Sequence, residues 1–372
     1  MNYGKKSAIN YSKGLEGVVA TETKISLVDG EKGHLVYRGY WAKDLALNHS
    51  FEEVAFLIWY GYLPNEEELT MFSDLLKKYR VIPKYLKNIL DLLPKDMDIM
   101  SVLRTSISAL GDSKFKWPPT IEQAIQLTAI IPSIIAYWYR KVNGKTYIEP
   151  NMDLDHIANY LYMLNGTEPN NAHTKALSAY FILTIEHGMN ASTFSSRVVA
   201  STESELISAI CVAIGAMKGP LHGGAPSAVI EMLEEIGSID NIEPWIIKKL
   251  ENGEKLMGFG HRIYKTKDPR AEALKEVAKS LSGEDEWFDL AIALEEKAIE
   301  LLNKYKPGKK LYTNVEFFAA AVMKGISLPQ ELFTPTFTAS RIVGWTAHVL
   351  EQASDNRIFR PQSIYTGNIP NS

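Results

Sequence analysis

Two histidines lie in glycine-rich segments of the kind that bring a ligand close to the backbone. His222 is in the segment GPLHGGAPSAV, and His261 is in the segment MGFGHRIYKTKDPR. The glycines beside each histidine have no Cβ, so they permit left-handed turns and close approach of a bound molecule. An imidazole changes charge near neutral pH and can therefore exchange protons with a substrate. Both segments are predicted to be loops that carry chemistry.

Arginines supply a second set of candidate ligand-binding groups. Arg270 follows a basic run after His261, and Arg341 and Arg360 lie in otherwise apolar or proline-bounded segments. If these three guanidinium groups converge, they form a clamp for a dicarboxylate, in which each charged hydrogen bond contributes about 1.5 to 3 kcal/mol. Each arginine is also suited to a structural ion pair. The sequence leaves both interpretations open.

The spacing of the histidines bears on metal binding. The chain has eight histidines, and no pair has the His-x-x-x-His spacing of a helical zinc site. His187, between Glu186 and Gly188, also fits a helix cap, because the helix dipole favours a cation at the C-terminal end. Glycine-flanked histidines such as His222 and His261 occur in ordinary turns as well. No metal site is predicted, although a metal-dependent hydrolase that uses these three histidines stays open as an alternative.

Composition and charge narrow the class of protein. The chain has 372 residues, of which 46% are hydrophobic and 23% charged, and this suits a globular protein of two or more lobes. Its net charge of −4 provides no overall positive field for nucleic acid or acidic lipid. The single cysteine, Cys211, excludes a disulfide framework within the chain. The segment MNYGKKSAIN lacks the apolar core of a signal peptide, which predicts a cytoplasmic protein with no membrane partner.

Most of the elements predicted to position the histidines and arginines are helices. Two β-prone runs, 25–28 and 34–37, predict a hairpin across Asp29 and Gly30. Later segments favour helices, including a core helix over 125–139 that falls short of the roughly 20 apolar residues of a membrane span. The predicted fold class is therefore all-α, with one short N-terminal hairpin.

A change of composition predicts the domain organisation. The segment 219–326 holds both glycine-rich loops and highly charged helices, whereas the flanking segments 1–218 and 327–372 are more apolar. We therefore expect a small domain, 219–326, inserted into a large domain that the two flanks form together. Such a junction favours hinge closure over a ligand.

Six segments resemble the signatures of the citrate synthase family: EHGMNASTF, GPLHGG, MGFGHRIYKTKDPR, TNVEFFAAAV, SRIVGWTAH and RPQSIYTG. The resemblance covers essentially the whole chain, including DGEKGHLVYRGY near its start. It is strongest to the short bacterial and archaeal form, and most of all to a minor citrate synthase of spore-forming Gram-positive bacteria. The resemblance implies a homodimer with large and small helical domains.

The resemblance also implies a reaction. Acetyl-CoA condenses with oxaloacetate, and water then cleaves the citryl thioester to citrate and CoA. Glu316 would be the base that removes a proton from the acetyl methyl group, and His222 would donate a hydrogen bond to the thioester oxygen. His261 would polarise the oxaloacetate carbonyl and protonate it. The oxaloacetate carboxylates would be bound by His187, Arg270, Arg341 and Arg360, the last donated by the neighbouring subunit.

For the co-substrate, the resemblance places the adenine of CoA against the loop before His261 and the phosphates near a lysine. The implied CoA-binding residues are Leu256, Met257, Gly258, Phe259, Gly260, Lys265 and Asn314. The resemblance implies no metal and no resident cofactor, since arginines and histidines supply the electrophilic help.

One residue departs from the family pattern. Where the family normally has aspartate, this chain has Glu316. The extra methylene moves the carboxylate by about 1.5 Å, and a displacement near 1 Å can lower a rate on the order of 100-fold unless the backbone compensates. A homologue that binds oxaloacetate or CoA and is weakly active or non-catalytic is thus one alternative. A 2-methylcitrate synthase that uses propionyl-CoA is another, since one methylene separates two substrates by only about 1 to 3 kcal/mol.

Overall fold

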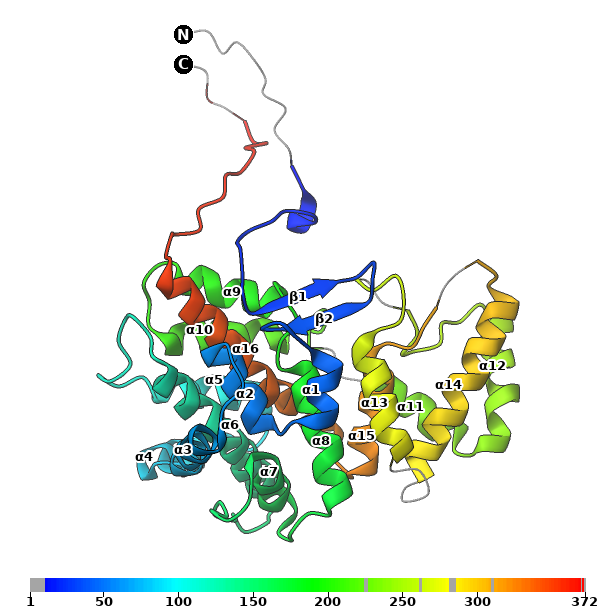
Figure 1. Ribbon diagram of the computed structural model, residues 1–372, viewed down its shortest axis with the longest axis horizontal. Helices are drawn as coiled ribbons and strands as arrows, with labels where there is room; N and C mark the ends of the chain where they lie inside the picture. Colours follow the sequence, from blue (N-terminus) through cyan, green and yellow to red (C-terminus); the bar gives the residue numbers. More distant parts are fainter. Residues whose placement is uncertain are drawn as a thin grey trace.

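The computed structural model describes residues 11–223, 227–260, 263–280, 286–308, 311–368 and 370. Over these residues the chain is mostly helical, with one small sheet near the N-terminus (Figure 1). This confirms the all-α fold class with a short N-terminal hairpin. Within the described part, no helix combines the length and the apolarity needed to cross a bilayer.

The sheet is a hairpin extended by a third short strand. The strands are β1 (Ser26–Asp29), β2 (His34–Tyr37) and β3 (Tyr40–Trp41). They are antiparallel in the order β1-β2-β3, with Leu27 opposite Val36. The hairpin was predicted from its two β-prone runs, whereas β3 is too short to give a sequence signal.

Most helices pack into one large body around a long C-terminal helix. They are α1 (Ala42–Asn48), α2 (Phe51–Tyr60), α3 (Glu66–Lys78), α4 (Lys84–Leu92), α5 (Ile99–Ala109), α6 (Ile121–Val142), α7 (His156–Asn165), α8 (Asn171–Thr184), α9 (Ala191–Ala200), α10 (Leu206–Lys218) and α16 (Phe333–Ser354). Helix α16 contacts α2, α5, α6, α8, α9 and α10. Its side chains are buried along almost its whole length, which explains why the apolar C-terminal segment was predicted to return to the large body.

Local sequence signals begin several of these helices. Ser50 caps α2, where its hydroxyl accepts a hydrogen bond from the Glu53 amide and the Glu53 carboxylate accepts one from the Ser50 amide. This capping box satisfies amide donors that have no partner inside the helix. Helix α6 covers the predicted core helix and buries an uninterrupted run, 127–138.

A second group of helices lies to one side of the large body (Figure 1). It consists of α11 (Ser227–Ile236), α12 (Ile242–Glu251), α13 (Pro269–Ser280), α14 (Glu286–Tyr305) and α15 (Val315–Gly325). These helices contact one another, and α13 and α15 also contact α8 of the large body. Short 3-10 helices complete the described elements at Lys13–Leu15, Ile239–Asn241 and Gln330–Leu332. The line along which α13 and α15 meet the large body is where the predicted site residues gather.

Candidate active site

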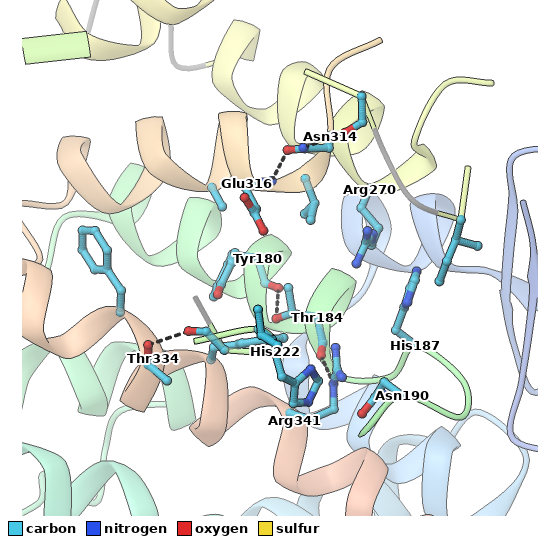
Figure 2. Close-up of a pocket in the computed structure, with 18 residues that line it drawn as sticks. Tyr180, Thr184, His187, Asn190, His222, Arg270, Asn314, Glu316, Thr334 and Arg341 are labelled. Atoms are coloured by element: carbon cyan, nitrogen blue, oxygen red, sulfur yellow. Dashed lines mark hydrogen bonds between the residues drawn. The ribbon is translucent and has the colours of Figure 1, made fainter. Parts of the chain in front are cut away.

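A cavity of about 430 Å³ lies between the two groups of helices (Figure 2). The predicted site residues that line it are His187, His222, Gly260, Arg270, Asn314, Glu316 and Arg341. They come from the loop after α8, the turn after α10, the loop between α12 and α13, the N-terminal ends of α13 and α15, and helix α16. The fold thus brings together residues that are far apart in the sequence.

Arg270 is held rigidly by a neighbouring carboxylate. The side chain of Arg270 is 5% exposed, and its Nε and Nη2 donate to the two oxygens of Asp268 at 3.0 and 2.9 Å. Burial opposes the charged form, but the carboxylate of Asp268 outweighs it and raises the pKa of Arg270. Asp268 also accepts a hydrogen bond from the Val315 amide at 3.1 Å. One carboxylate therefore fixes both the arginine and the start of α15.

Arg341 brings a second guanidinium to the cavity from the middle of α16. Its side chain is 2% exposed, and Nε donates to the Thr184 carbonyl oxygen at 2.6 Å. The guanidinium also lies over the Phe337 ring, 4.8 Å from its centroid. Burial lowers the pKa of Arg341, while the nearby carboxylate of Glu186 favours the charged form. A buried cation in this setting suits an anionic ligand.

His222 is oriented by a serine of α9. Its Nε2 lies 2.6 Å from the Ser192 hydroxyl, which also accepts a hydrogen bond from the Trp345 indole at 2.9 Å. Burial and then Arg341 lower the pKa of His222 to about 4, so the ring is neutral at pH 7. The turn that carries it is tight, since a Cβ at Gly223 would lie 1.9 Å from the Met217 carbonyl oxygen. Gly223 thus permits close packing of this turn against the backbone of Met217.

Glu316 enters the cavity from the first turn of α15 (Figure 2). Asn314 caps this helix, and its side-chain oxygen accepts a hydrogen bond from the Glu316 amide at 3.1 Å. Burial of the carboxyl group raises the pKa of Glu316, Arg270 opposes that shift, and Asp268 adds to it. A carboxylate with a raised pKa is a stronger base than a solvated one.

The loop before His261 is pinned to the start of the same helix. The backbone amide of Asn314 donates to the Gly258 carbonyl at 2.9 Å, and the side-chain amide of Asn314 donates to the Gly260 carbonyl at 3.0 Å. Gly258 and Gly260 have left-handed φ angles of 81° and 84°, as predicted for this glycine-rich loop. His261 itself lies outside the described residues.

A second cavity, of about 380 Å³, adjoins the first along this loop. It shares Asn314 and Glu316 with the first cavity and is otherwise lined by Lys255, Leu256, Met257, Gly258, Phe259, Leu302, Lys306 and Leu311. The predicted CoA loop therefore lies between α14 and α15, next to the candidate base. Lys255 and Lys306 were not singled out from the sequence, because lysines in charged segments give no specific signal.

His187 is fixed by groups on both sides of it. Its Nε2 lies 3.0 Å from the Tyr264 hydroxyl. The preceding residue, Glu186, is fully buried and accepts hydrogen bonds from the Ser26 hydroxyl at 3.0 Å and the Gly188 amide at 2.5 Å. Its Oε1 also lies 3.1 Å from His348 Nε2. Burial would raise the pKa of Glu186, but His348 and Arg341 hold it below its ordinary value.

Two predicted residues do not line either cavity. Arg360 belongs to the extended segment after α16, which runs away from the helices in Figure 1, and it lies near Phe194 and Val198 of α9. Lys265 is exposed, and its backbone amide donates to the Gly30 carbonyl at 2.8 Å. Neither side chain reaches the candidate site of its own chain as described.

Among the described residues, no group of three or more histidine, cysteine, aspartate or glutamate side chains is arranged to hold a metal ion.

Comparison with known proteins gives consistent matches over the whole chain. The family model described as "Citrate synthase, C-terminal domain" matches residues 14–362. Citrate synthase 2 of Bacillus subtilis is 42% identical, with 96% of each chain covered. The 2-methylcitrate synthase of Shewanella oneidensis is also 42% identical, covering 96% of this chain and 95% of the relative. Among solved structures, the citrate synthase of Thermoplasma acidophilum in ternary complex with carboxymethyl coenzyme A and oxaloacetate is 32% identical, with a TM-score of 0.85 and 97% of both chains covered.

Proposed function

The chain belongs to the citrate synthase family, and on that premise we propose that it condenses acetyl-CoA with oxaloacetate and hydrolyses the product to citrate and CoA. The observation that carries this proposal is the meeting of Glu316, His222 and the two arginines at one cavity. A carboxylate base, a neutral hydrogen-bond donor and a dicarboxylate clamp are the groups that this carbon–carbon bond formation requires.

Oxaloacetate binds at the arginine end of the cavity. Arg270 and Arg341 pair with its two carboxylates, and His187 adds a hydrogen bond. Asp268 holds the Arg270 fork in place before the ligand arrives, so little side-chain entropy is lost on binding. The buried setting of both arginines strengthens each charged hydrogen bond relative to one in water.

Glu316 removes a proton from the methyl group of acetyl-CoA. Burial raises its pKa, which makes the carboxylate a better base. Its side chain, longer than the aspartate of the family pattern, lines both cavities, where the two substrates would meet.

His222 stabilises the negative charge that develops on the thioester oxygen. A neutral imidazole can do this only through the nitrogen that carries its proton. In this mechanism the Ser192 hydroxyl, which donates to Asn190 Oδ1 at 2.8 Å in the structure, turns to donate to His222 Nε2 instead. The proton of the neutral ring then lies on Nδ1, which can donate to the substrate. His261 would polarise the oxaloacetate carbonyl, as the family resemblance implies.

CoA occupies the adjoining cavity, with its thioester end at the shared wall of Asn314 and Glu316. Leu256 to Phe259 provide an apolar and backbone-rich surface for the adenine. Lys255 and Lys306, which line this cavity, replace Lys265 as the proposed partners of the phosphates.

The site needs a second subunit and a moving domain in this proposal. Arg360 lies outside the cavity of its own chain, which supports its donation across a homodimer interface. The small domain, 219–326, closes on the large domain, 1–218 with 327–372, after oxaloacetate binds, and excludes water from the enolate. The cytoplasmic location and a place in the tricarboxylic acid cycle are part of the same proposal.

Propionyl-CoA is the second candidate acyl donor, because a 2-methylcitrate synthase is as similar to this chain as a citrate synthase is. Steady-state kinetics with acetyl-CoA and propionyl-CoA test the proposal. We expect a higher kcat/KM for acetyl-CoA, and a preference for propionyl-CoA would reassign the reaction. Binding of oxaloacetate without release of CoA thiol would favour a binding-only homologue, and loss of activity in a chelator would favour a metal-dependent hydrolase.

A further inference from the structure

The turn of the β1–β2 hairpin packs against the segment that leads to Arg270. The Lys265 amide donates to the Gly30 carbonyl at 2.8 Å. A Cβ at Gly30 would lie 2.2 Å from the Ile263 carbonyl oxygen, and one at Gly33 would lie 2.8 Å from the Lys267 carbonyl oxygen. These are contacts with backbone, which cannot move aside as the tip of a flexible side chain can. In Figure 1 the hairpin reaches from the large body toward the loops beside α13.

The same hairpin also holds the segment that carries His187. Ser26 of β1 donates to the Glu186 carboxylate at 3.0 Å. The hydroxyl of Tyr37, in β2, is 2.9 Å from the Glu186 carbonyl and 3.2 Å from the Leu183 carbonyl. The side chain of Tyr37 is fully buried, so these acceptors satisfy a hydroxyl that has no access to water.

The segment that leads to Arg270 and the segment that carries His187 meet inside the candidate site. Tyr264, which follows Ile263, is buried, and its hydroxyl lies 3.0 Å from His187 Nε2. The Arg270 guanidinium lies over the Tyr264 ring, 5.6 Å from its centroid. A displacement of the segment 263–267 would therefore move Tyr264, and with it the surroundings of two proposed oxaloacetate ligands.

We propose that Gly30 is a positioning residue for the oxaloacetate site, acting through its close contact with Ile263 and Lys265 and onward through Tyr264. The proposal rests on the proposed function, which assigns His187 and Arg270 to oxaloacetate. Gly30 does not touch the substrate, and its part is to let the hairpin dock closely enough to fix the segment 263–267.

A substitution at Gly30 can disturb the docking of the hairpin without disturbing the folding of its turn. Gly30 does not have a left-handed φ, so alanine fits its backbone conformation and only the space is lacking. The turn keeps its own hydrogen bonds, since Asp29 accepts from the amides of Glu31 and Lys32 at 3.1 and 3.0 Å. Gly39, beside the same sheet, has a φ of 92° and no atom within 4 Å of a built Cβ. Substitution there strains the backbone without touching the site.

The test compares Gly30→Ala with Gly39→Ala in the full-length protein. For Gly30→Ala we expect kcat/KM for oxaloacetate to fall on the order of 10- to 100-fold, with the KM for acetyl-CoA nearly unchanged. Gly39→Ala lowers Tm but keeps the KM for oxaloacetate. An unchanged kcat/KM for oxaloacetate in Gly30→Ala, or equal effects of the two substitutions, would overturn the inference.

Tyr264→Phe keeps the inference testable if Gly30→Ala does not fold. This variant removes only the hydroxyl that contacts His187, so we expect a higher KM for oxaloacetate, and an effect that is not additive with Gly30→Ala when the double variant is made. An unchanged KM in Tyr264→Phe would contradict the proposed link. If the wild-type chain itself releases no thiol from acetyl-CoA, the proposed function fails; an active wild type with unaffected variants refutes the positioning role alone.

Discussion

The hydroxyl oxygen of Ser192 lies 2.6 Å from Nε2 of His222. Because the pKa of about 4 leaves the ring neutral with a single N–H, the direction of this hydrogen bond determines which ring nitrogen carries the proton. The proton lies on Nδ1 when the hydroxyl donates to Nε2 and not to Asn190 Oδ1, which lies 2.8 Å from it. The indole of Trp345 donates to the same hydroxyl at 2.9 Å and holds it in place. In the proposed mechanism, this buried serine orients the ring through which His222 donates a hydrogen bond to the substrate.

Replacing Ser192 by alanine should reduce turnover more than substrate binding. Without the hydroxyl, His222 loses its tautomer control, and we expect kcat to fall on the order of 10- to 100-fold, less than the loss from deleting an oxyanion donor outright. The KM for oxaloacetate should change little. Ser195→Ala is the matched control, because its hydroxyl donates to the Ser192 carbonyl and not to His222. Equal kcat values for the two variants would contradict this role.

The raised pKa of Glu316 predicts a pH-dependent effect on stability. The folded state holds the proton more tightly than the unfolded chain does, so the favourable contribution is complete below the ordinary value of 4.5 and is lost as pH rises through the folded pKa. Glu316→Gln should therefore have a higher Tm than wild type at pH 7, and this difference should vanish under acidic conditions. Thermal unfolding at several pH values measures it, and a lower Tm at pH 7 would count against the burial argument.

The two lysines of the second cavity should affect only the binding of acetyl-CoA. Lys255→Ala and Lys306→Ala are each expected to raise the KM for acetyl-CoA about two- to fivefold, the range of a solvent-exposed ion pair. Added salt should weaken the wild-type affinity in the same direction. Lys265→Ala serves as the control, since its side chain lines neither cavity. A larger effect from Lys265 than from the other two would restore it as the phosphate partner.

Mixing two inactive chains tests whether Arg360 crosses between subunits. A heterodimer of Arg360→Ala with Glu316→Gln contains one site in which both side chains are intact, if the arginine comes from the partner. We expect such mixtures to regain up to about half of the wild-type activity per dimer, by symmetry of the two sites. Verified heterodimers that stay inactive would place Arg360 in a different role.

The sequence indicated candidate site residues more readily than the residues that hold them in position. His222, Arg270 and Arg341 could be found because glycine-rich or apolar surroundings make a polar side chain stand out. Ser192 and Tyr264 could not, since a serine in a helix or a tyrosine in a basic loop has many ordinary roles, and their partners are distant in the chain.

The hairpin illustrates the same limit. Alternating β-prone residues and an Asp29–Gly30 turn predict its local structure, but nothing local indicates that its turn docks on the segment 263–267. That contact depends on how the two groups of helices pack. Likewise, the family resemblance implies a glutamate base at 316, whereas its raised pKa follows from burial and from the nearby Asp268, which together outweigh the opposing charge of Arg270.

The most direct test of the central claim is the release of CoA thiol from acetyl-CoA, with and without oxaloacetate, by wild type and Glu316→Gln. The account predicts oxaloacetate-dependent release by wild type, its loss in Glu316→Gln, and retention in that variant of the thermal stabilisation by oxaloacetate. Undiminished thiol release by Glu316→Gln would contradict the assignment of Glu316 as the base.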